Sequence, residues 1–209
     1  MSTGCVMTPS SAEDLLARQA ALQDEAREVL AGLDLAALVS DVGPFLVTGS
    51  FVSGLMCWRE LDVMVLAGRG CSPQDVMGLL ARIVSRAGVT GIEYRDERGP
   101  RCVTGQVRDE RYHVTLTVEH AGRDWQIDLS LWLHDLHENV TRWHEELRER
   151  ITAEQRRAVL RVTDDWYRRP AYPHHVGGLP GDLHCRPRGR RPHPGQFAAG
   201  LAQHGLPVT

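Results

Sequence analysis

The chain has 209 residues and a mass of 23.3 kDa, the size of one domain with a small appendage. Its hydrophobic fraction of 42% is ordinary for a globular protein and excludes a disordered or fibrous chain. A net charge of −3 argues against a nucleic acid partner, because non-specific affinity for nucleic acid comes from clustered positive charge. We therefore expect a globular protein that acts on a small molecule or a nucleotide.

Two further features of the composition concern location. No apolar run approaches the roughly 18 residues of a membrane span, and no basic region precedes an apolar stretch at the N-terminus. The five cysteines form no Cys-x-x-Cys pair, which argues against both a disulfide framework and a zinc knuckle. These features predict a cytoplasmic protein with reduced thiols and no membrane partner.

The N-terminal part of the chain predicts two helices and a strand. The first helix begins after a cap at Ser10 or Ser11 and ends at Gly32, and a short helix follows over 33–40. A Gly-Pro breaker then precedes the short apolar run 45–48, which has the composition of a strand and stops at a Gly-Ser turn.

The middle of the chain predicts a second strand and a well-marked helix. Residues 51–58 form a short helix or turn, and 61–66 form the strand. Ser72 then caps a helix that has Pro at its first position and an acid in its first turn, and Gly88 ends this helix.

The second half of the chain predicts strands followed by helices. Residues 89–95 and 102–107 are expected to be strands, and 112–119 pairs with 125–133 in an antiparallel hairpin. Asp135 with Glu138, and Thr152 with Gln155, have the spacing of capping boxes that open two helices, which run to about Arg150 and Arg168.

This order of elements predicts the α+β class, with a mixed sheet and helices packed against it. The expected organisation is N-terminal helices over 1–42, a core over 43–134, C-terminal helices over 135–170, and an irregular tail over 171–209 in which a short terminal helix can form.

Three carboxylates stand out as candidates for chemistry. Side chains alternate along a strand, so Glu60 and Asp62 project from one face. Asp128 lies between apolar residues in a strand that otherwise has the pattern of a core strand, where burial of a charge is costly. A divalent cation is the usual compensator, because Mg²⁺ binds carboxylate oxygens and keeps positions for water and phosphate oxygens. The three acids therefore predict a metal and base site.

The segment from Thr48 to Val63 and the later Trp125–Asp128 resemble the nucleotidyltransferase fold of the DNA polymerase β-like superfamily, and in particular an actinobacterial branch of it. The pattern is a Gly-Ser turn after an apolar strand, then acid-hydrophobe-acid-hydrophobe, then a lone Asp on a later strand. The resemblance extends to about Gly178 and implies a nucleotidyltransferase-like sheet with a C-terminal helical segment.

The resemblance also implies a role for each residue of this pattern. Gly49 and Ser50 would hold a nucleoside triphosphate (NTP), the paired acids Glu60 and Asp62 would bind Mg²⁺, and Asp128 would help to bind metal or activate the acceptor hydroxyl. The implied reaction moves a nucleoside monophosphate from the NTP to a hydroxyl of a small molecule or a protein, and pyrophosphate leaves. The alternative is a weak or inactive nucleotide-binding or interaction protein of the same fold, such as a component of a toxin–antitoxin pair.

One departure from the pattern leaves two registers open. The first of the paired acids is Glu60, where the superfamily prefers Asp, and two-metal geometry tolerates small shifts poorly. In the other register Asp62 is the first acid and Met64 takes the second position, which would cripple the site. We favour the first register because it keeps both positions acidic. A Gly-Ser turn and a solvated strand acid are common without any function, so the third acid, Asp128, carries much of the argument.

The C-terminal stretch 181–195 has no helical or strand period. The branch that the chain resembles continues at this point with a short helix and then a Phe-containing helix, and 195–201 resembles the latter. GC-rich codons for 181–195, translated one base out of phase, can encode the missing helix. We therefore predict that 181–195 is a frame-shifted segment without a well-packed helix.

Overall fold

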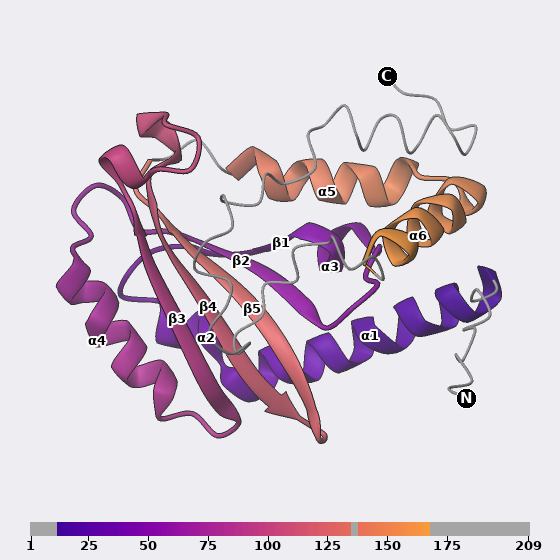
Figure 1. Cartoon of the computed structure of the whole chain (residues 1–209), viewed down its shortest axis with the longest axis horizontal. Coiled ribbons are helices and arrows are strands. Elements are labelled where there is room, and N and C mark those ends of the chain that lie inside the picture. The colour runs from indigo at the N-terminus through magenta and orange to yellow at the C-terminus, as the bar shows by residue number, and fades with distance from the viewer. Residues whose placement is uncertain (1–11, 135–137, 168–209) are drawn as a thin grey trace, which may run out of the picture.

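The computed structural model describes residues 12–134 and 138–167 (Figure 1). The helices are α1 (Ala12–Leu33), α2 (Leu35–Leu38), α3 (Gly49–Ser53), α4 (Pro73–Val84), α5 (Glu138–Arg150) and α6 (Ala153–Tyr167). The strands are β1 (Phe45–Thr48), β2 (Glu60–Leu66), β3 (Val89–Glu97), β4 (Arg111–His120) and β5 (Arg123–Trp132). Two short 3₁₀ turns, Gly99–Arg101 and Val107–Asp109, lie between β3 and β4.

The five strands form one mixed sheet in the order β1-β2-β5-β4-β3 (Figure 1). β2 and β5 run parallel in its centre, and the other neighbouring pairs are antiparallel. The predicted α+β class, with a mixed sheet, flanking helices and a C-terminal helical segment, is confirmed.

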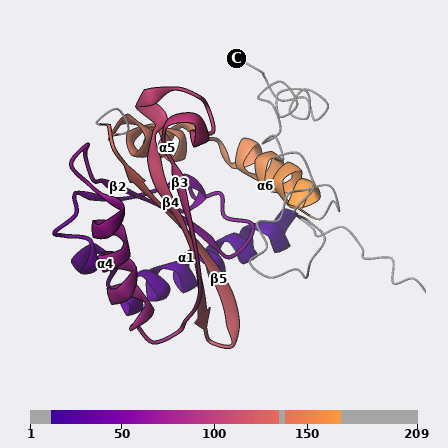
Figure 2. The same ribbon diagram turned by 60° about the vertical axis from the view of Figure 1, so that its left-hand side comes forward.

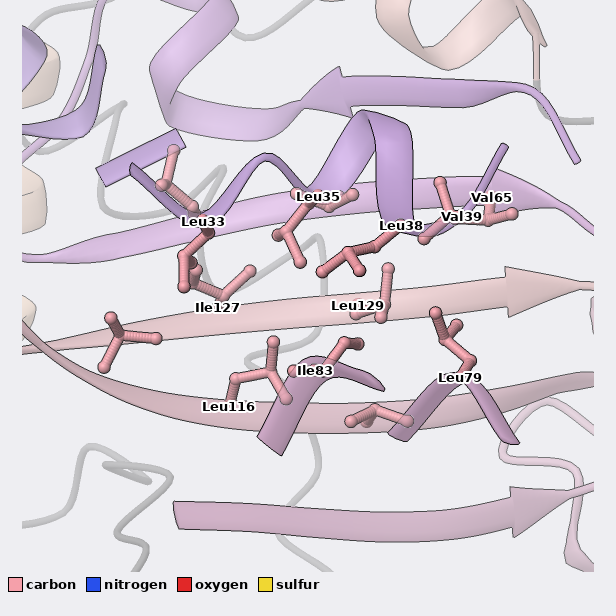
Figure 3. Packing of buried hydrophobic residues seen from close by; sticks show 14 of the residues in the cluster. Leu33, Leu35, Leu38, Val39, Val65, Leu79, Ile83, Leu116, Ile127 and Leu129 are labelled. Atoms are coloured by element: carbon pink, nitrogen blue, oxygen red, sulfur yellow. The ribbon is translucent and has the colours of Figure 1, made fainter. Parts of the chain in front are cut away.

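One face of the sheet is apolar and carries the main core. Alternate residues of β2, β4 and β5, among them Leu61, Leu116 and Ile127, are fully buried there because every second side chain of a strand points to the same face. Helices α1, α2 and α4 cover this face, and Figure 3 shows leucines of these helices and Ile83 of α4 packed on the strands. The other face therefore carries the polar alternate residues of the same strands.

The C-terminal helices lie away from this core. α5 packs on α3 and β1, where the Thr141 hydroxyl donates to the carbonyl of Val47 over 3.3 Å. Arg156 of α6 donates to the carbonyl of Gly54 over 2.5 Å, and a second small core forms around Leu160. In the view of Figure 2, α4 and α6 lie on opposite sides of the strands.

Local signals in the sequence account for several element boundaries. Ser72 caps α4 as predicted, and it forms a full capping box with Asp75: the Asp75 amide donates to Ser72 Oγ over 3.3 Å and the Ser72 amide donates to the Asp75 carboxylate over 2.8 Å. Thr152 and Gln155 cap α6 in the same reciprocal way. Both helix starts are therefore confirmed.

The β4–β5 hairpin is confirmed and tighter than expected. Its strands pair as far as His120 and Arg123, so only Ala121 and Gly122 form the turn. Both turn residues have positive φ, 51° and 72°, as a two-residue type I′ turn requires.

The prediction of a strand over 102–107 is wrong. The Gly105 amide donates to the carbonyl of Cys102 over 3.1 Å, and the Thr104 hydroxyl donates to Asp109 over 2.6 Å. Gly105 also has a φ of 72°, which is outside the strand region. These local bonds satisfy the backbone as a loop, and a short β-favouring composition does not outweigh them.

Within residues 12–134 and 138–167, every helix is too short or too polar to cross a bilayer. Several predictions lie outside the described residues: the Ser10 or Ser11 cap, the Asp135 capping box, the tail over 171–209 and the frame-shifted segment over 181–195.

Candidate active site

The three predicted carboxylates meet on the polar face of the sheet. β2 and β5 are adjacent and parallel, and their register pairs Asp62 directly with Asp128. Glu60 lies two residues before Asp62, on the same face. One carboxylate oxygen from each of the three lies within 4.8 Å of the others, and each side chain is half-buried. We call Glu60, Asp62 and Asp128 the acidic triad.

Glu60 is held by Trp58, which lies just before β2 and contacts helix α6. The Trp58 indole N–H donates to Glu60 Oε2, and the Trp58 ring stacks on Tyr167 of α6 with 4.5 Å between ring centroids. The carboxylate of Glu60, the residue at which the sequence departs from the expected Asp, is thus engaged by the indole.

Asp128 is held by two neighbours on the same face. The Thr115 hydroxyl donates to Asp128 Oδ1 over 3.1 Å, and the Gln126 side-chain amide donates to the same oxygen over 3.2 Å. Our reasoning from sequence missed both residues. The available signal was the hairpin register, because a two-residue turn after His120 places Thr115 opposite Asp128.

Gly49 lies against the triad, and two observations favour glycine at this position. Its φ of 69° is in the left-handed region, which side chains with a Cβ rarely adopt. A Cβ at Gly49 would also lie 2.7 Å from Cγ of Asp62 and closer still to Oδ2. Ser50 follows as the second residue of α3, and its carbonyl accepts from the Leu55 amide over 2.9 Å.

An unsatisfied hydroxyl adjoins the same place. Thr48 pairs with Asp62 across β1 and β2, so both side chains point to the polar face. Thr48 Oγ1 is buried and has no hydrogen-bond partner among the described residues. A buried polar group without a partner is unfavourable, so this hydroxyl is an unusual feature beside the triad.

The residues present fit a hard divalent cation. Three carboxylates this close repel one another unless a cation or a proton compensates them, and oxygen-only donor sets suit Mg²⁺. Met64, the second position of the alternative register, is only 4% exposed and has no side-chain oxygen to contribute. The geometry therefore favours the register with Glu60 and Asp62.

Comparison with solved structures supports the fold. The chain is similar to Cid1, described by its RNA terminal uridylyl transferase activity, with a TM-score of 0.50 and 16% identity over 74% of this chain and 43% of Cid1. It also resembles the non-canonical poly(A) polymerase GLD-2 in complex with GLD-3, with a TM-score of 0.46 and 13% identity over 74% of this chain and 50% of that one. No protein-family model and no curated protein matches the chain. This chain thus has a nucleotidyltransferase-like fold, and it spans half or less of the length of Cid1 and of GLD-2.

Proposed function

We propose that the protein is a Mg²⁺-dependent nucleotidyltransferase that moves a nucleoside monophosphate from an NTP to a hydroxyl of a small molecule or a protein. The observation that carries this proposal is the acidic triad beside Gly49 on a nucleotidyltransferase-like sheet. The actinobacterial origin and the cytoplasmic location expected from the sequence stay predictions.

In this proposal each residue has a distinct role. Glu60 and Asp62 hold the metal, whose positive charge, when bound, stabilises the triphosphate and the departing pyrophosphate. Backbone N–H groups of Gly49 and Ser50 face the phosphates. Asp128 binds metal or, as a base, takes the proton of the acceptor hydroxyl at a carboxylate oxygen. The acceptor oxygen then forms a bond to the α-phosphorus while the bond from that phosphorus to the bridging oxygen of pyrophosphate breaks.

The test uses the full chain, each labelled NTP, Mg²⁺ and host-cell extract, and asks which component becomes labelled. Asp62→Asn and Asp128→Asn should each lower the rate of transfer by about 10²-fold or more. Mutation of residues that only hydrogen-bond to metal ligands already lowers metal affinity or activity by ~10–100-fold. The control is Asp124→Asn. This variant removes an exposed carboxylate that lies outside the triad but on the same strand, β5, and the same face as Asp128. Unchanged transfer in either triad variant contradicts the assignment.

Stability measurements separate this effect from misfolding. Removing one of three neighbouring negative charges relieves repulsion in the metal-free protein, so the free energy of unfolding should stay equal or rise in both triad variants. A drop in stability that matches the loss of transfer indicates misfolding instead.

The second candidate is a nucleotide-binding or interaction protein of the same fold without turnover, such as a toxin–antitoxin component. The observation in its favour is Glu60, whose longer side chain is engaged by Trp58. Mg²⁺-dependent NTP binding with no labelled acceptor would support it. An RNA oligonucleotide is one of the acceptors to include, because Cid1 is described by its RNA terminal uridylyl transferase activity. We expect no labelling of RNA, because a protein with a net charge of −3 attracts nucleic acid poorly.

A further inference from the structure

A row of polar side chains extends from Asp128 across the polar face of β4 and β5. His113 Nε2 lies 3.4 Å from Thr115 Oγ1, and His113 Nδ1 lies 3.4 Å from Ser130 Oγ. Arg111 Nη1 donates to Ser130 Oγ over 2.9 Å. We call these four residues the β4–β5 relay: Arg111, Ser130, His113 and Thr115.

The relay follows from the register of three strands. Thr115 is directly opposite Asp128, and His113 is directly opposite Ser130, so cross-strand neighbours make the lateral contacts. Alternate residues of β4 make the contacts along the strand. At the far end, Arg111 Nε donates to Glu97 of β3 over 2.7 Å, which anchors the guanidinium.

With Asp128 ionised and His113 neutral, the hydrogen bonds of the relay have one consistent direction. An ionised Asp128 can only accept, so the single Thr115 hydroxyl proton is donated to it and Thr115 Oγ1 must accept from His113. His113 therefore carries its proton on Nε2, and Nδ1 accepts from the Ser130 hydroxyl. Ser130 in turn accepts from Arg111, which can only donate.

Burial supports a fixed and neutral imidazole. His113 and Ser130 are only 8% and 6% exposed. Burial and the nearby Arg111 guanidinium lower the pKa of His113, while Asp128 and Glu97 oppose this shift and Arg95 adds to it. A neutral ring has one donor and one acceptor, which is what the relay requires of it.

We propose that the β4–β5 relay, with Gln126, is a positioning device that holds Asp128 Oδ1 and presents the other carboxylate oxygen to the metal or the acceptor hydroxyl. Thr115 and Gln126 both donate to Oδ1, and no described residue is seen to donate to Oδ2. A carboxylate fixed at one oxygen keeps its plane when its two negative neighbours repel it. This proposal rests on the proposed function of the triad.

The first arm of the test replaces Thr115 and measures Mn²⁺ affinity of the full chain as a probe of the triad. Thr115→Val removes the hydroxyl and should weaken binding about tenfold or more, whereas Thr115→Ser restores the hydroxyl and the affinity. The matched control is Thr117→Val, which changes the next residue on the same face of β4, opposite Gln126. Unfolding in urea should show similar stability for both valine variants.

The second arm observes the imidazole directly. Nitrogen-15 shifts of His113 in the unmodified, metal-free protein should report a neutral ring protonated on Nε2, with the signal assigned by its loss in His113→Gln. That variant keeps a side-chain amide donor near the position of Nε2 and should bind Mn²⁺ more tightly than His113→Leu.

The outcomes distinguish this proposal from the function on which it rests. If Asp128→Asn weakens Mn²⁺ binding but Thr115→Val does not, the relay is wrong and the triad survives. If Asp128→Asn has no effect either, the proposed function itself is wrong. A His113 ring protonated on Nδ1 contradicts the proposed direction of the hydrogen bonds, whatever the Mn²⁺ affinities of the variants are.

Discussion

The contact between Gly49 and Asp62 leads to a demanding prediction for the variant Gly49→Ala. At a φ of 69° an alanine costs ~1–2 kcal/mol relative to glycine, because its Cβ approaches the following carbonyl oxygen. The new Cβ would also overlap Asp62 Oδ2, so the carboxylate has to retreat by about 1.5 Å to reach an ordinary contact. A displacement of this size at a catalytic group costs on the order of 10²-fold.

The matched control for this variant is Gly68→Ala. Gly68 has nearly the same φ, 72°, but a Cβ there would have no neighbour within 4 Å. Both variants should therefore lose ~1–2 kcal/mol of unfolding free energy in urea. Only Gly49→Ala should also lose Mn²⁺ affinity, by on the order of 10²-fold, because only its Cβ displaces a proposed ligand. Equal Mn²⁺ affinity in the two variants refutes the reasoning.

Two further predictions concern Glu60 and Cys57. Glu60→Asp withdraws the carboxylate from Trp58 and should weaken Mn²⁺ binding less than Glu60→Ala does; a silent Glu60→Ala would instead favour the register that uses Met64. Burial raises the pKa of the Cys57 thiol to about 12, so at pH 8 about one molecule in ten thousand carries the reactive thiolate. Iodoacetamide should therefore leave Cys57 unmodified in the folded protein and modify it in urea, as peptide mass mapping would show; rapid modification of the folded protein would count against its burial.

Sequence patterns with a range of a few residues predicted most elements correctly. The Ser72 capping box depends on residues three apart, and the alternation of β2 depends on residues two apart. The same alternation is enough to place Glu60 and Asp62 on one face of their strand. The strand expected over 102–107 failed because its signal was composition alone, and local hydrogen bonds at Thr104 and Gly105 decided otherwise.

Strand order and register, which only the tertiary structure decides, bring the acids and their partners together. Asp128 was a candidate in the sequence, but the parallel pairing of β2 with β5 places it beside Asp62, 66 positions earlier in the chain. The stacking of Trp58 on Tyr167, and the support of Asp128 by Thr115 and His113, likewise arise between segments brought together by folding. The sequence by itself determined the short-range periods and the presence of the acids. Their partners came from the fold, because the energies that select a register are summed over the whole sheet and its core.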